Sequence, residues 1–82
     1  MKTEKQILQL EVGKFCKEHR IEVLNLSLQE LSDDSGINYK TLYSFESGLS
    51  SNIYIFFLYY NRSPKPEMFL NELLETVGGL EW

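Results

Sequence analysis

Four side chains that can contact nucleic acid lie within six consecutive residues of this chain. They are Tyr39, Lys40, Tyr43 and Ser44, which supply two phenol rings, a cation and a hydroxyl. On a helix, this spacing places all four on one side. A lysine ammonium can bind a phosphate or a guanine, and a tyrosine ring can contact a thymine methyl group. A solvated helix face is the simpler alternative, and we favour DNA contact because the surrounding pattern turns these residues outward.

The other reactive side chains do not form a catalytic or metal-binding set. Cys16 stands on an apolar stripe, which favours a buried, inert thiol over a redox sensor or a metal ligand. His19 has no cysteine or second histidine at ligand spacing. Asp33 and Asp34 either face a basic partner or, more simply, form an exposed helix face. The sequence contains no phosphate-binding loop, no dinucleotide-binding turn and no serine–base arrangement, so we expect no enzyme, no cofactor and no metal.

Two short helices are predicted to position the four residues. Ser27 is a good N-cap for the first, and Glu30 completes a capping box three residues later. Leu31, with Leu28 one turn before it, is the inward residue of this helix. Gly36 can adopt a positive φ without steric strain, so the pattern predicts a helix that ends in a tight turn.

The second short helix begins after Asn38, which is again a favourable N-cap. Leu42 and Phe45 are three residues apart and share its inward face. Glu46 is interpreted as a structural residue, and Gly48 ends the helix. Because the apolar pair faces inward, the tyrosines and the lysine face outward.

Residues 27–48 resemble the helix-turn-helix motif of the Xre/Cro/CI family of phage and bacterial repressors. The family pattern of a capped helix, a turn glycine and a second capped helix is matched without gaps. The matching residues are Ser27, Glu30, Leu31, Ser32, Gly36, Ile37, Asn38, Thr41, Leu42, Glu46 and Gly48. The resemblance implies an all-α, five-helix fold like that of lambda repressor, whose second motif helix lies in the DNA major groove.

Three positions depart from the family pattern. Leu28 stands where the family has a DNA-contacting glutamine, Ser35 replaces an apolar residue, and Lys40 is the only cation on the second helix. In the family, the loop after the motif approaches a DNA phosphate, where Ser51 and its neighbours can donate hydrogen bonds. The DNA-binding residues that the resemblance implies are Asn38, Tyr39, Lys40, Thr41, Tyr43, Ser44, Ser47, Ser50 and Asn52.

The net charge of −4 is unusual for a DNA-binding protein. Residues 1–66 contain equal numbers of acidic and basic side chains. The excess is supplied by Glu67, Glu72, Glu75 and Glu81. Exposed charges more than about 8–10 Å apart are screened at physiological salt, so a distant acidic tail does not block the second helix. Lys40 alone still predicts weak non-specific binding, because cationic contacts to phosphate dominate that affinity.

Further helices are predicted on both sides of the motif. One runs from about Thr3 to Arg20, and another runs from about Pro66 to Val77. The apolar face of the helix from about Pro66 to Val77 is predicted to contain Phe69, Leu70, Leu73, Leu74 and Val77. Residues 53–60 are apolar throughout, so periodicity does not distinguish helix from strand. The order of elements in the motif family favours a helix there.

An all-apolar helix in so small a domain leaves part of its surface without a partner inside the chain. The predicted inward residues of this helix are Ile53, Phe56, Phe57 and Tyr60. The predicted outward residues, which we expect to form a homodimer interface, are Tyr54, Ile55, Leu58 and Tyr59. The alternative is ordinary core with one exposed apolar edge.

Length and composition suit one small domain over residues 1–82. The hydrophobic fraction of 43% and the charged fraction of 24% are typical of a folded globular chain. The longest apolar run is too short for a membrane span, and no signal pattern precedes the first helix. A single cysteine cannot form an internal disulfide, so we expect a cytoplasmic protein.

Two function classes remain. The leading hypothesis is a sequence-specific, double-stranded DNA-binding transcriptional regulator that acts as a homodimer, similar to Cro-like repressors and restriction–modification controllers. We expect no small-molecule ligand, because the chain has no room for a sensing domain. The acidic balance, Leu28 and the lone Lys40 support the alternative, a helix-turn-helix-derived protein-binding module that sequesters a repressor, a polymerase or a nuclease.

Overall fold

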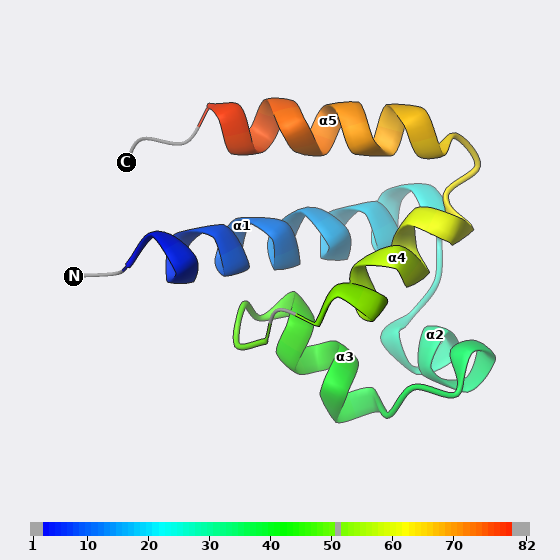
Figure 1. Ribbon diagram of the computed structural model, residues 1–82. Helices are drawn as coiled ribbons and strands as arrows, with labels where there is room; N and C mark the ends of the chain where they lie inside the picture. The colour runs from blue at the N-terminus through cyan, green and yellow to red at the C-terminus, as the bar shows by residue number, and fades with distance from the viewer. Residues whose placement is uncertain (1–2, 51, 80–82) are drawn as a thin grey trace.

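The chain folds into five α-helices and one π-helical turn, with no strand in residues 3–50 and 52–79, which the computed structural model describes (Figure 1). In chain order the helices are α1 (Glu4–His19), the π-helical turn η1 (Arg20–Leu24), α2 (Leu28–Ser35), α3 (Tyr39–Glu46), α4 (Ile53–Arg62) and α5 (Pro66–Gly78). The all-α prediction is therefore confirmed. Within the same residues, none of the helices is both long enough and apolar enough to cross a membrane.

Helix α1 lies at the centre of the arrangement. It packs against α3 on one side and against α5 on the other, and α5 also contacts α4 (Figure 1). The two outer helices α3 and α5 therefore present their exposed surfaces in different directions.

Helix α1 begins with a capping box that was not predicted from the sequence. The Thr3 hydroxyl accepts a hydrogen bond from the Gln6 backbone N–H, and the Gln6 side chain accepts one from the Thr3 N–H. At its other end α1 widens into η1, which ends at Asn25 with a left-handed φ of 55°. Asparagine tolerates this conformation better than most residues, so the chain can turn sharply toward α2.

The predicted junction between the two short helices is confirmed. The Ser27 hydroxyl and the Glu30 carboxylate form a reciprocal capping box at the start of α2. Gly36 ends α2 with a φ of 75°, a backbone conformation that side chains with a Cβ rarely adopt. The Asn38 side chain then caps α3 by accepting a hydrogen bond from the Lys40 N–H at 2.8 Å.

A glycine allows α1 and α3 to approach each other closely. A Cβ on Gly13 would contact the Phe45 carbonyl oxygen and lie 2.8 Å from the Glu46 carbonyl oxygen. Both oxygens belong to the last turn of α3, so any larger residue would push the two backbones apart. This contact fixes the distance between α3 and the central helix.

Residues 53–60 are helical, as predicted, within α4. The side of α4 that faces the core, however, is not the predicted one. Ile55 and Tyr59 are fully buried, although both were predicted to face outward in a dimer interface, and that prediction is wrong. An all-apolar stretch has no periodicity to indicate which side faces the core. The deciding partner is Glu46 of α3, which accepts a hydrogen bond from the Tyr59 hydroxyl.

Two of the four residues of α4 that were predicted to face inward are instead exposed. Ile53 and Phe57 were expected to be buried, yet they are 66% and 49% exposed. Phe56 and Tyr60 are half-buried and contact the ring of Phe69 in α5. The core-facing side of α4 therefore centres on its fully buried pair, with these two rings at its edge.

Helix α5 packs through a narrow apolar stripe. Phe69 is buried against the rings of Phe15 and His19 of α1, and Leu73 is buried one turn later. Of the five residues predicted to share the inward face, Leu70 and Leu74 are instead exposed. The whole apolar side of α5 is therefore wider than the stripe that the rest of the chain covers.

Candidate nucleic-acid interface

The outer surface of α3 carries the tyrosines and the lysine that were predicted to contact DNA. Tyr39 and Tyr43 are 43% and 57% exposed, and Lys40 is also exposed. Leu42 and Phe45, on the opposite side of the helix, are buried in the core. The predicted division of α3 into an inward apolar side and an outward polar–aromatic side is confirmed.

The other predicted residues of α3 are less accessible. Thr41, Ser44 and Ser47 are half-buried, and the Ser47 N–H closes the helix on the Tyr43 carbonyl oxygen. Asn38 is exposed, but its side-chain oxygen is occupied in capping. These four residues therefore lie at the edge of the exposed surface. They can add contacts there, but they do not form its centre.

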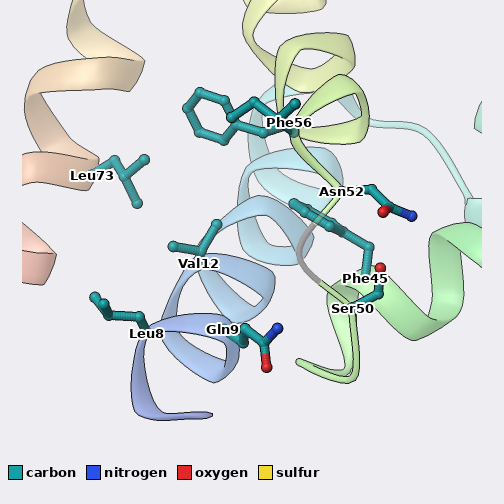
Figure 2. A pocket seen from close by; sticks show the side chains of 9 residues that line it. Leu8, Gln9, Val12, Phe45, Ser50, Asn52, Phe56 and Leu73 are labelled. Atoms are coloured by element: carbon teal, nitrogen blue, oxygen red, sulfur yellow. The ribbon is translucent and has the colours of Figure 1, made fainter. Parts of the chain in front are cut away.

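The loop residues lie in a different environment. Ser50 and Asn52 line an apolar cleft between α1, α4 and α5, beside the end of α3 (Figure 2). Asn52 stands at the N-cap position of α4, yet its side chain makes no capping hydrogen bond. Ser51 lies outside the described residues. The structure places Ser50 and Asn52 at this cleft and not beside the tyrosines of α3.

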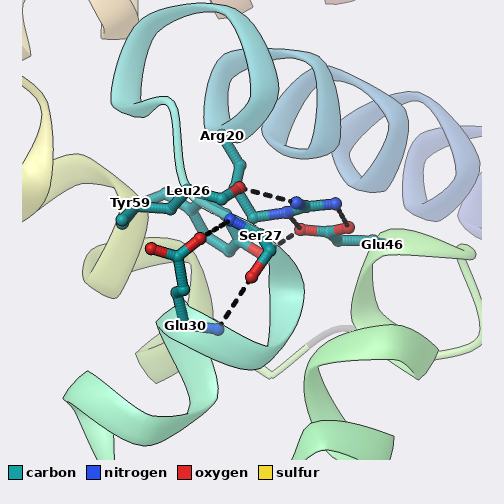
Figure 3. Close-up of polar contacts among 6 residues, drawn as sticks. All are labelled: Arg20, Leu26, Ser27, Glu30, Glu46 and Tyr59. Carbon is teal, nitrogen blue, oxygen red and sulfur yellow. Dashed lines mark hydrogen bonds and ion pairs between the residues drawn. The ribbon is translucent and has the colours of Figure 1, made fainter.

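A buried polar network holds α3 in place from behind. Arg20 and Glu46 form a two-pronged ion pair, with Nε–Oε2 and Nη2–Oε1 distances of 2.8 and 3.0 Å (Figure 3). The third guanidinium nitrogen donates to the Leu26 carbonyl oxygen at 2.9 Å. The Tyr59 hydroxyl donates to the same Glu46 carboxylate. The network thus joins η1, the link before α2, α3 and α4 around one carboxylate.

The network shifts the ionisation of its members in the direction that keeps the ion pair intact. The hydrogen bond from Arg20 to Glu46 raises the pKa of the guanidinium, which stays charged. Burial, together with the hydrogen bond to Glu46, raises the pKa of Tyr59, which stays a neutral donor. Two-pronged arginine–carboxylate pairs are geometrically specific, so this pair fixes the rotation of α3 about its axis.

Sequence reasoning identified Glu46 as structural but did not find its partners. Arg20 is 26 residues earlier in the chain, at the point where α1 gives way to η1. No local periodicity connects the two residues. The available signal was an arginine and a glutamate that both interrupt otherwise apolar inward faces.

Cys16 and His19 occupy buried positions on α1, and the burial of Cys16 was predicted from its place on the apolar stripe. Burial raises the pKa of the Cys16 thiol to about 12, which is consistent with an inert thiol. His19 contacts the rings of Phe15 and Phe69. Burial lowers the pKa of His19, and the carboxylate of Glu72 partly opposes that shift.

The charge on the exposed part of α3 is small but positive. Lys40 carries its only exposed charge, because Glu46 is buried in the ion pair. Within residues 3–50 and 52–79, no carboxylate forms an ion pair with Lys40. No family model, curated protein or solved structure matches the chain, so residue chemistry and geometry carry the functional argument.

Proposed function

We propose that the chain is a sequence-specific DNA-binding transcriptional regulator with a lambda-repressor-like helix-turn-helix, and that α3 enters the major groove. The observation that carries this proposal is the division of α3 into a fixed inner side and an exposed outer side. A reading helix must be rigid, because base edges are recognised by geometry. The contact with Gly13 and the Arg20–Glu46 pair provide that rigidity.

In this proposal, Lys40 and the two tyrosines contact different groups of the DNA. The Lys40 ammonium binds a phosphate or the acceptor edge of a guanine. Tyr39 and Tyr43 stand beside it, where their rings contact thymine methyl groups and their hydroxyls contact phosphate oxygens. Asn38, Thr41, Ser44 and Ser47 add polar contacts at the edge of this surface, and Ser50 and Asn52 are at most peripheral.

Two copies acting together complete the mechanism. One cation on α3 gives few phosphate contacts, and a homodimer on a palindromic site doubles them. Two α3 helices would enter successive major grooves about 34 Å apart. Of the four residues expected at the dimer interface, Tyr54 is exposed and Leu58 is half-buried, and these two remain candidates. A promoter covered in this way would be closed to polymerase.

The experiment begins with selection of binding sites from a randomised DNA duplex library. A fluorescein-labelled copy of the selected duplex is then titrated by anisotropy at several salt concentrations. Lys40→Ala should weaken binding by about 1–3 kcal/mol and reduce the salt slope by about 1. Lys65→Ala is the matched control, because Lys65 is an exposed lysine at the start of α5. Equal binding and equal slopes for the two variants would reject the role of α3.

The second candidate is a protein-binding module that uses the same fold to sequester a repressor, a polymerase or a nuclease. The net charge of −4 and the single cation on α3 favour it. Under this alternative, no duplex is enriched by selection at physiological salt. Tyr39 and Tyr43 would then serve as aromatic anchors in a protein interface.

A further inference from the structure

We propose that the cleft between α1, α4 and α5 is a docking site for a basic, amphipathic helix of a protein partner. This site is separate from the outer surface of α3, and the inference does not depend on DNA binding. We call it the cleft, and its apolar walls are formed by Leu8, Val12, Phe45, Ile53, Phe56 and Leu73 (Figure 2).

The cleft has the size of a pocket for one large apolar side chain. Its volume is about 280 Å³, and its lining is almost entirely apolar. Protein interfaces concentrate binding energy where an aromatic or aliphatic anchor fills such a pocket. Because the cleft opens to solvent between helices, the anchor can enter from another chain.

Further exposed apolar residues stand on α4 and α5. Ile53 and Phe57 are exposed on α4, and Leu70 and Leu74 are exposed on α5. Ile53 lines the cleft, Phe57 contacts the ring of Phe56, and Leu74 follows Leu73 in the chain. A helix that lays its apolar side in a groove contacts residues on two such walls.

The charge of the surrounding helices indicates which charge the partner would carry. Helix α5 has no lysine or arginine from Pro66 to Gly78. On α1, residues 4–12, which run alongside the cleft, add two carboxylates and one ammonium, and α4 has no charge before Arg62. Glu72 lies in a different hollow, beside His19. The remaining charged residues are Glu4, Lys5, Glu11, Glu67 and Glu75, all exposed except the half-buried Glu11. Four carboxylates against one ammonium favour lysine or arginine on the partner.

The same charge argues against two other occupants. Duplex DNA would bring phosphates toward these carboxylates, which repel them. A second copy of the chain, paired through a two-fold axis, would bring two copies of the same acidic surface together. That pairing would also set the two α3 helices at opposite ends of the dimer, because α3 and α5 lie on opposite sides of α1 (Figure 1).

The test uses a synthetic, fluorescein-labelled helical peptide of leucine, lysine, alanine and one phenylalanine. Its apolar residues stand at positions i, i+3, i+4 and i+7, and a scrambled peptide of the same composition is the control. We expect anisotropy to show binding of the ordered peptide only. Amide NMR shifts should centre on Val12, Ile53 and Leu73, with none on Tyr39 or Tyr43.

Two kinds of variant measure separately how much the apolar pocket and the carboxylates contribute to peptide binding. Val12→Phe fills the cleft from inside and should weaken peptide binding by about tenfold or more. Glu67→Lys combined with Glu75→Lys should weaken binding and reduce its salt dependence, whereas Asp33→Lys combined with Asp34→Lys, an equal charge change on α2, should not. Leu74→Lys serves in place of Val12→Phe if that variant does not fold, because Leu74 is exposed.

Several results would overturn the proposal. Equal binding of the scrambled peptide, or of a peptide with glutamate in place of lysine, would remove the claimed specificity. Peptide-induced shifts on α3 would place the site elsewhere. Concentration-dependent shifts of the cleft residues without peptide would show a second copy there instead. Lys40→Ala should leave peptide binding unchanged, so failure of DNA binding and failure of this proposal are separable.

Discussion

Helices α3 and α5 lie on opposite sides of α1 and are held to it by opposite kinds of contact. Behind α3 is a buried ion pair between Arg20 and Glu46, and the two backbones touch at Gly13. Behind α5 are aromatic contacts, in which Phe69 meets the rings of Phe15 and His19. Polar contacts fix orientation, whereas apolar packing fixes proximity with less angular restriction.

The outer surfaces of α3 and α5 also differ in their chemistry. That of α3 is aromatic with one cation, and that of α5 is apolar with three carboxylates. A surface that reads a polyanion needs a fixed geometry and no exposed carboxylate of its own. A surface that accepts an amphipathic helix needs apolar area and charge, and can tolerate adjustment. This difference supports our two proposals, in which the two sides of one small domain bind different partners.

The largest expected effect comes from breaking the support behind α3. Glu46→Ala removes the carboxylate and leaves the buried Arg20 charge and the Tyr59 hydroxyl without their acceptor. We expect a loss of about 3–5 kcal/mol in the free energy of unfolding, measured by circular dichroism in urea. The exposed Glu18→Ala is the control. A Glu46→Ala midpoint equal to that of the control would mean that the network does not hold α3.

A smaller effect is expected at the contact between α1 and α3. Gly13→Ala places a Cβ against two carbonyl oxygens of α3, which should destabilise the fold by about 1–3 kcal/mol despite alanine's better helix propensity. Gly78→Ala, whose Cβ would meet no neighbour, should instead be neutral or slightly stabilising. The urea midpoints of the two variants measure the difference. Equal midpoints would show that α3 can move away from α1 freely.

The smallest effect is a pH dependence on the α5 side. Burial lowers the pKa of His19 in the folded chain below its usual 6.5, so the unfolded chain binds the proton more readily. The stabilising contribution is complete above pH 6.5 and decreases as the pH falls below it. His19 is the only histidine in the chain, and His19→Leu should remove this dependence below about pH 6.5. An unchanged slope in that variant would assign the titration to another group.

The parts of the fold that the sequence predicted are those set by local chemistry. Ser27, Gly36 and Asn38 act through neighbours within four residues, so their caps and the positive φ could be predicted. The burial of Leu42 and the exposure of Lys40 follow from helical periodicity. The outer surface of α3 was predictable for this reason.

The parts that the sequence did not predict depend on contacts across the chain. Residues 53–60 have no charged side chain to indicate an outward side, and the orientation of α4 follows from the hydrogen bond between Tyr59 and Glu46. The widening of α1 into η1 places Arg20 within reach of the same carboxylate. The cleft needs three helices and the end of a fourth in one place, so no single stretch of sequence encodes it.

The most direct test of the central claim is an NMR titration of the ¹⁵N-labelled protein with the selected duplex. The claim is that the outer surface of α3 binds DNA while the α5 side does not. We predict amide shifts and line broadening at Tyr39, Lys40 and Tyr43, with Leu70 and Leu74 unchanged. Shifts centred on α5 and the cleft, with α3 unchanged, would contradict the account.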